Sequence, residues 1–533
     1  MKRISTLTLL LMVLRMNSQA QAFPELQVTA YDTASSGYYF FCPYYLIGYP
    51  TFPPGTQRQM ILDDKGQLVY YKDVNGMFAG DFKLHWNGLM SYSANHQFYL
   101  MDSTFTVVDS VYIQNGVMDD LHELQILPNG NFVILGLEEV QRDLSSYNMF
   151  LGNGSPGSSN ATVRANVIQE LDPNNNVVFE WHSIDHFNFD DVDEYFLTDT
   201  GTVDWTHMNA IEMDTDGNYL LSSKHLNEIT KISRADSSII WRLGGKRNQF
   251  TFIGDSIQFL SQHDCRRIAN GHITLFDNGR NLSPIHPAAA KEYALDEVGM
   301  TANLVWSYIE GDTVYSRSQG NVQRLTNGNT LISYGDLYPK NIVFNVVDSM
   351  KQKIFEVSFP DTLLTYRTFN FPELPWTLNR PSISCSNSVG QFTLEADSGH
   401  SSYRWSTGDS TQSIVVSDTG IYYVFVPHGD GGFLASENFM VSDISNPCYR
   451  LSVEEFVVEK SIILFPNPTF DRLTIRISNQ NTSFGNLEIL DITGARVMTL
   501  DLYQNEFSID VSNLISGTYF LKIANYRGRF VKI

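Results

Sequence analysis

The sequence predicts an all-β protein in which a six-bladed β-propeller is followed by two small β-sandwich domains. Three observations predict it. Aromatic residues make up 13% of the chain, with 34 Phe and 27 Tyr, a bias that favours strands over helices. One pattern recurs: an apolar strand, a glycine-containing turn and a second apolar strand. With 533 residues, the chain is also longer than one core usually supports, so several domains are expected.

The propeller is expected over residues 23–375. Its turns carry Asn-Gly or Asp-Gly pairs, which supply the positive φ angles of tight hairpins. These pairs are Asn129–Gly130, Asp216–Gly217, Asn270–Gly271 and Asn327–Gly328. Further apolar segments lie between the hairpins, so each repeat holds about four strands, the size of a propeller blade. Six blades fit this length best.

A proline-containing stretch near residue 375 ends the propeller. Residues 376–449 form short alternating strands with frequent turns, which is typical of a small sandwich and resembles the immunoglobulin-like modules of exported Bacteroidetes proteins. Cys385 and Cys448 flank this module in a way that suits a disulfide. Cys42 and Cys265 either pair or stay free, and we interpret Cys265 as a packed strand residue.

The two ends of the chain indicate export. Residues 1–22 read as a signal peptide: two basic residues, an apolar run over 7–14 and the cleavage-site pattern Ala20-Gln21-Ala22. No later stretch reaches the roughly 18 apolar residues of a transmembrane helix. The net charge of −22 argues against nucleic acid as a partner, because such binding needs a basic face.

Residues 461–533, after an acidic linker at 450–460, form the second sandwich. This segment resembles the C-terminal sorting domain of the type IX secretion system. The matching elements are Pro466-Asn467-Pro468, Asp491 to Gly494, Leu514 to Tyr519, Arg529 and Lys532. The resemblance implies that the type IX machinery is a partner and that the protein passes through the periplasm to become secreted or surface-bound.

Four histidines stand at the ends of strand-like segments and predict one shared pocket. They are His122, His207, His225 and His263. In a radial arrangement of sheets, the inner strand ends meet at a common channel, where several imidazoles can hold an anion or a metal, or react.

The segments DWTHMN and QHDC, with the text around them, resemble the arylsulfate sulfotransferase family over about residues 35 to 345. That resemblance implies an exported propeller enzyme that moves a sulfuryl group from an aryl sulfate donor to a phenolic acceptor, with no nucleotide, cofactor or metal. His263 matches the family's nucleophile, which becomes transiently sulfurylated. His122, His207 and Asn209 match residues that bind the sulfuryl oxygens.

One position departs from the family pattern: Lys224 stands where the family has arginine, which keeps the charge but loses the planar fork. His225 is a further candidate, either orienting Lys224 or lining the pocket. Arg267 is the last candidate, since strand alternation lets only one of Arg266 and Arg267 face the pocket. The aromatic residues at 38–45 we interpret as a buried strand rather than a ring-stacking surface.

These residue types suit sulfuryl transfer on chemical grounds. Like phosphoryl transfer, it should pass through a loose transition state with negative charge on three oxygens, which convergent donors stabilise. A neutral imidazole is a good nucleophile near pH 7. Two other hypotheses stay open: a non-catalytic surface propeller that binds glycan or protein, and a metal-dependent hydrolase or lyase with His122, His207 and His263 as ligands.

Overall fold

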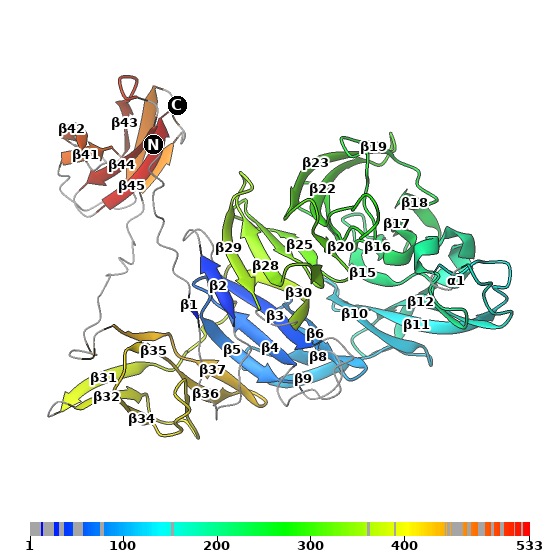
Figure 1. Cartoon of the computed structure of the whole chain (residues 1–533), viewed down its shortest axis with the longest axis horizontal. Helices are drawn as coiled ribbons and strands as arrows, with labels where there is room; N and C mark the ends of the chain where they lie inside the picture. The colour runs from blue at the N-terminus through cyan, green and yellow to red at the C-terminus, as the bar shows by residue number, and fades with distance from the viewer. Residues whose placement is uncertain are drawn as a thin grey trace. The chain divides into compact units, whose positions relative to one another are not determined.

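Figure 1 shows the computed structural model of the chain. It describes residues 12–13, 26–30, 37–45, 57–74, 79–150, 154–359, 363–388, 391–442, 444, 448, 462–465, 469, 471–477, 486–491, 495–501, 506–515, 517–523 and 526–532. The expected signal segment lies outside these residues except for Met12–Val13, and the expected linker at 450–460 lies wholly outside them. The chain divides into two compact units, Met1–Cys448 and Tyr449–Ile533.

The predicted all-β propeller fold is confirmed. In the first unit, six sheets each contain a run of four antiparallel strands among the described residues, and in five of these runs the strands follow one another in chain order. The second and third sheets comprise β6 (Gly80–Leu84), β7 (Met90–Ala94), β8 (Gln97–Met101) and β9 (Val107–Val111), then β10 (Met118–Ile126), β11 (Phe132–Arg142), β12 (Ala161–Leu171), β13 (Val177–His182) and β14 (Thr202–Asp204). The fourth comprises β15 (Met208–Met213), β16 (Tyr219–Ser223), β17 (Glu228–Ile232) and β18 (Ile239–Gly244).

The fifth and sixth sheets continue this order. The fifth comprises β20 (His263–Arg267), β21 (Ile273–Asp277), β22 (Ala289–Asp296), β23 (Thr301–Ile309) and β19 (Thr251–Ile253). The sixth comprises β25 (Asn321–Arg324), β26 (Thr330–Ser333), β28 (Ile342–Val347), β29 (Lys353–Ser358), β2 (Gln27–Ala30) and β1 (Met12–Val13). The glycines of the four predicted hairpin turns all have positive φ, between 83° and 86°, as the turn chemistry requires.

The first sheet closes the ring, because it joins strands from both ends of the propeller. Its strands are β3 (Tyr38–Tyr45), β4 (Arg58–Leu62), β5 (Leu68–Asp73) and β30 (Leu363–Phe371). The late strand β30 pairs antiparallel with the early strand β3. Tyr39, Phe40 and Phe41 of β3 are fully buried, which confirms the buried-strand interpretation of this aromatic segment.

Helical segments are short and lie between β13 and β17. They are α1 (Ser183–His186) and the 3-10 turns η1 (Phe189–Asp191), η2 (Glu194–Phe196) and η3 (Lys224–Leu226). A small two-stranded sheet pairs β24 (Tyr315–Ser316) with β27 (Leu337–Tyr338). In the chain, β24 precedes the first hairpin of the sixth sheet and β27 follows it. None of the helices in the described parts of the chain has the length and apolar character needed to cross a membrane.

The module after the propeller is joined to it by a shared sheet. Its strands are β31 (Ile383–Ser388), β32 (Gln391–Ala396), β33 (Arg404–Trp405), β34 (Ser413–Val416), β35 (Gly420–Tyr422), β36 (Val424–His428), β37 (Gly432–Ala435) and β38 (Phe439–Val441). Strand β37 pairs antiparallel with β5, so the first propeller sheet grows to seven strands. The predicted disulfide between Cys385 and Cys448 is confirmed. Cys42 and Cys265 are free and buried, which settles their pairing.

The second unit is an all-β domain with its own core. Its two sheets contain β39 (Ile462–Phe465), β40 (Arg472–Ile477) and β43 (Glu506–Asp510), and β41 (Asn486–Leu490), β42 (Arg496–Asp501), β44 (Gly517–Ile523) and β45 (Tyr526–Lys532). Leu473, Leu487 and Phe530 are among the fully buried side chains between these strands.

Candidate active site

A cavity of about 370 Å³ lies at the inner strand ends of the propeller. Four of the predicted residues line it together: His122, His207, Lys224 and His263. The imidazole centroids of His122 and His207 are 5.1 Å apart, and those of His207 and His263 are 6.4 Å apart. Residues from sheets three, four and five therefore share one pocket, as predicted, although His122 lies within β10 at a bulge rather than at a strand end.

Bulges in the first strands of four sheets direct these side chains. The strand register shifts between Gly80 and Lys83, between Asp120 and Leu124, between Met208 and Ala210, and between His263 and Arg266. A bulge adds a residue to one strand and re-aims the side chains beside it, which is why bulges are frequent next to active sites. The backbone of His207 has a positive φ of 46°, an uncommon conformation for a residue other than glycine.

His263 is held as a neutral imidazole with a defined tautomer. It is buried, and its Nδ1 lies 2.8 Å from Oδ1 of Asn278. The backbone N–H of Gln319 donates to Nε2 over 3.0 Å, so Nδ1 carries the proton. Burial, with the positive charge of Lys224, lowers the pKa of His263 well below its usual value. The lone pair of Nε2 is therefore present throughout the neutral pH range.

His122 has a different partner and a different charge preference. Its Nδ1 hydrogen-bonds the carboxylate of Asp120, two residues earlier in the chain. Burial works to lower the pKa of His122, but the negative charge and hydrogen bond of Asp120 outweigh it, so the pKa is raised. This imidazole therefore stays protonated to a higher pH than a free histidine, and in that form its second nitrogen is a cationic donor.

His207 lines the cavity, and His225 stacks on it from behind. Nδ1 of His207 lies 2.5 Å from Oδ2 of Asp204, and the two imidazole centroids are 4.5 Å apart. Nδ1 of His225 bonds the backbone carbonyl of Asp204 at 2.6 Å, and its ring stacks on Phe196 at 3.9 Å. Burial lowers the pKa of both histidines. His225 does not line the cavity and instead supports the ring of His207.

Lys224 presents a buried cation to the cavity. The residue is 8% exposed, and no hydrogen bond or ion pair to its ammonium occurs within the part of the chain that the structure describes. Its Nζ lies 5.7 Å from the ring centroid of Phe196. Burial lowers the pKa of Lys224 to about 8, with the charge of Asp204 opposing and that of Arg280 reinforcing the shift. An anion in the cavity would supply the missing partner of this ammonium.

Besides His225, two further predicted substrate-binding residues do not line the cavity. The Asn209 side chain is buried, donates to the carbonyl of Gln262 over 2.8 Å and accepts from the N–H of Asp264, so it ties down both neighbours of His263. Arg267 forms ion pairs with Asp214 and Glu297, away from the pocket. Its neighbour Arg266 takes part in a buried charge cluster instead.

Several residues of the site were missed by the sequence reasoning. Asp120, Asp204 and Asn278 hydrogen-bond Nδ1 of the three cavity histidines, and Tyr366 lines the cavity. Tyr44 also lines it, although the sequence analysis interpreted its segment as a buried strand only. A carboxylate two or three residues before His122 and His207 was the available signal for the first two. Asn278 follows the neighbouring strand β21, so finding it required the hairpin register.

One group of side chains has the spacing of a metal site. The ligand atoms of Asp204, His207 and His225 all lie within 4.8 Å of one another. This group differs from the three histidines expected as metal ligands, because it contains neither His122 nor His263. Asp204 already bonds both of its histidines through hydrogen bonds.

Comparisons with known proteins place two parts of the chain in families. A family model described as Arylsulfotransferase (ASST) matches residues 44–367, more than half of the chain, and one described as a secretion system C-terminal sorting domain matches residues 463–532. No curated protein matches the chain.

Solved structures share only low identity with this chain. A Bacteroides caccae protein of unknown function is 12% identical, with a TM-score of 0.38, covering 63% of this chain and 98% of that one. Virginiamycin B lyase from Staphylococcus aureus is 8% identical, with a TM-score of 0.32, covering 73% and 99%. The β-propeller domain of Cps50 (Swd1) from Myceliophteria thermophila is 10% identical, with a TM-score of 0.32, covering 57% and 81%.

Proposed function

This chain belongs to the arylsulfotransferase family, and on that premise we propose that it transfers a sulfuryl group from an aryl sulfate to a phenol through a covalent intermediate on His263, without a nucleotide. Its C-terminal sorting domain makes it a secreted or cell-surface protein that is handled by the type IX machinery. The observation that carries the proposal is the pairing, in one cavity, of the neutral buried imidazole of His263 with the buried ammonium of Lys224, which has no hydrogen-bond or ion-pair partner among the described residues.

The first step forms a nitrogen–sulfur bond. Nε2 of His263 attacks the sulfur of the aryl sulfate as the bond from sulfur to the aryl oxygen breaks, and the phenolate leaves. Nδ1–H stays bonded to Asn278, which keeps the lone pair on the attacking nitrogen. The incoming sulfur takes the place of the Gln319 N–H on Nε2, and that N–H is then free to donate to a sulfuryl oxygen.

The second step returns the enzyme to its starting form. The oxygen of a phenolic acceptor attacks the sulfur as the nitrogen–sulfur bond breaks. The acceptor's proton passes to solvent, from which the first phenolate takes one. His263 is again neutral, and the products are a new aryl sulfate and the first phenol. Ping-pong kinetics follow from this order.

The cavity supplies donors for the charge that develops on the sulfuryl oxygens. The donors are protonated His122 and the ammonium of Lys224, which line the same cavity. The neutral imidazole of His207 donates its N–H to Asp204 and completes the wall. Preorganised donors in a buried site stabilise such charge without reorganising at the moment of reaction. Tyr44 and Tyr366 line the same cavity, and their rings suit an aryl group.

The test is turnover of a chromogenic aryl sulfate with added phenol, followed by mass spectrometry after brief exposure to donor alone. We expect a sulfuryl adduct on His263 and none in His263→Asn. Turnover should survive chelation, since no step uses a metal. Loss of turnover on chelation would instead favour a metal centre at Asp204, His207 and His225, and an adduct on another residue would refute the assignment of the nucleophile.

A further inference from the structure

The inner strands place a charged, buried residue directly after each of four cavity residues. The adjacent pairs are Gly80 and Asp81, His122 and Glu123, His263 and Asp264, and Tyr366 and Arg367. They belong to four different strands, β6, β10, β20 and β30. The first member of each pair lines the cavity, and the second lies in a charge cluster beside it. Because the two members are adjacent in the chain, a displacement of the charge cluster moves the backbone of the cavity residues.

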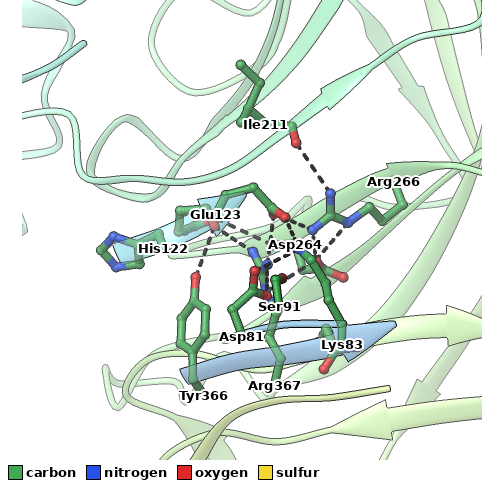
Figure 2. Close-up of polar contacts among 12 residues, drawn as sticks. Asp81, Lys83, Ser91, His122, Glu123, Ile211, Asp264, Arg266, Tyr366 and Arg367 are labelled. Atoms are coloured by element: carbon green, nitrogen blue, oxygen red, sulfur yellow. Dashed lines mark hydrogen bonds and ion pairs between the residues drawn. The ribbon is translucent and has the colours of Figure 1, made fainter. Parts of the chain in front are cut away.

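Arg367 connects the members of this cluster. Its side chain is fully buried, and one terminal nitrogen donates to Oδ1 of Asp81 over 2.9 Å and to Oε2 of Glu123 over 2.8 Å. Its other terminal nitrogen donates to the backbone carbonyl of Asn209 over 2.6 Å. Figure 2 shows these bonds converging from several strands, with His122 and Tyr366 at one side of the cluster.

The cluster balances its charges. Lys83 donates to Asp81 over 2.7 Å and to Glu123 over 2.5 Å, and Arg266 donates to Glu123 and Asp264. Three carboxylates thus face three cations. Burial would raise the pKa of Glu123, but Arg266, Arg367 and Lys83 outweigh it and hold the pKa well below its usual value, so the carboxylate stays ionised.

The bonds of Arg367 lead to both sides of the proposed reaction site. Through Glu123 it reaches the neighbour of His122. Through Asn209 it reaches His263, because the Asn209 side chain bonds the residues before and after that histidine. The guanidinium also lies 4.8 Å from the ring centroid of Tyr366. Only a planar, multi-donor cation can hold these partners together.

We infer that Arg367 is a positioning residue that sets the separation between the nucleophile His263 and the donor His122. Since β30 closes the propeller ring, this residue also makes the site depend on ring closure. The expected change in rate rests on the proposed function, whereas the positions of the two imidazoles can be measured without turnover.

The experiment compares Arg367→Lys with Arg242→Lys. Arg242 is a matched control, since it is a partly buried guanidinium that pairs with Glu228 and Asp191 from an outermost strand, β18. We expect Arg367→Lys to lower the single-turnover rate of His263 sulfurylation about 10- to 100-fold with nearly unchanged donor affinity, because small misplacements cost large factors in rate. Arg242→Lys should keep the wild-type rate per folded molecule.

A second readout uses the imidazole NMR signals of His122 and His263 without substrate. Both should shift in Arg367→Lys and neither in the control. Should Arg367→Lys fail to fold, the charge-balanced double variant Glu123→Gln with Arg367→Gln replaces it, with the same expectations. Unshifted signals, or equal rate losses in variant and control, would overturn the inference. A wild-type protein without turnover would refute the proposed function, while the NMR comparison would still decide the positioning role.

Discussion

Replacing Lys224 with methionine removes the cation of the cavity while keeping an unbranched stem against Phe196. Lys224 is only 8% exposed, so water screens its charge poorly. Two unit charges at about 4 Å interact by roughly 4 kcal/mol at an effective dielectric constant of about 20. Only part of this interaction energy is specific to the transition state. Removing one such donor costs about 3 kcal/mol of transition-state stabilisation.

That energy corresponds to a loss of about two orders of magnitude in the transfer rate. The pH dependence gives an independent check. The ammonium is charged below its pKa of about 8, so the transfer rate should fall as the pH rises through about 8. Lys224→Arg should retain transfer and remove this decline, because a guanidinium stays protonated in proteins.

The assay is aryl sulfate turnover between pH 6 and pH 10 for the wild type, Lys224→Met and Lys224→Arg. Lys340→Met serves as the control, since this exposed lysine pairs with Glu310 outside the cavity. Unchanged turnover in Lys224→Met would refute the role of this charge. An identical alkaline decline in Lys224→Arg would assign that decline to another group.

Three further outcomes are expected. Deleting residues 461–533 should leave turnover per molecule unchanged and retain the protein in the periplasm of a Bacteroidetes host; equal surface display of both forms on fractionation would contradict this. A chain ending at residue 375 should unfold at lower temperature and self-associate more than one ending at 448, because β5 loses its partner β37; calorimetry and size-exclusion chromatography measure both effects. Burial lowers the pKa of His263 in the folded protein below its value in the unfolded chain. Its contribution to the free energy of unfolding is therefore fully present above about pH 6.5 and is lost as the pH falls below that value, by up to about 1.4 kcal/mol per pH unit. Urea unfolding of His263→Asn should show a correspondingly weaker pH dependence, and an equal one would contradict the argument.

Local signals allowed much of the fold and half of the site to be predicted. The Asn-Gly and Asp-Gly turns fixed the hairpins, and strand-end positions together with the family resemblance brought four cavity residues into view. Arg267 shows where such reasoning stops. Alternation along a strand holds only while the register is regular, and the bulge between His263 and Arg266 breaks it. The pairing of β37 with β5 is equally inaccessible, because it joins edges of two segments far apart in sequence.

The three cavity histidines also show why sequence alone does not assign chemical roles. All three are imidazoles of inner strands that line one cavity. His122 and His207 both bond a carboxylate through Nδ1, yet the pKa of His122 is raised, whereas burial and the charge of Lys224 lower that of His207. Asp120 makes His122 a cationic donor, whereas the neutral amide of Asn278 leaves His263 uncharged with its lone pair on Nε2. Environments that push the pKa values of like groups apart separate nucleophile from donor. Exchanging the partner should therefore exchange the property: Asn278→Asp should raise the pKa of His263, and an unchanged titration of its ring would contradict this account.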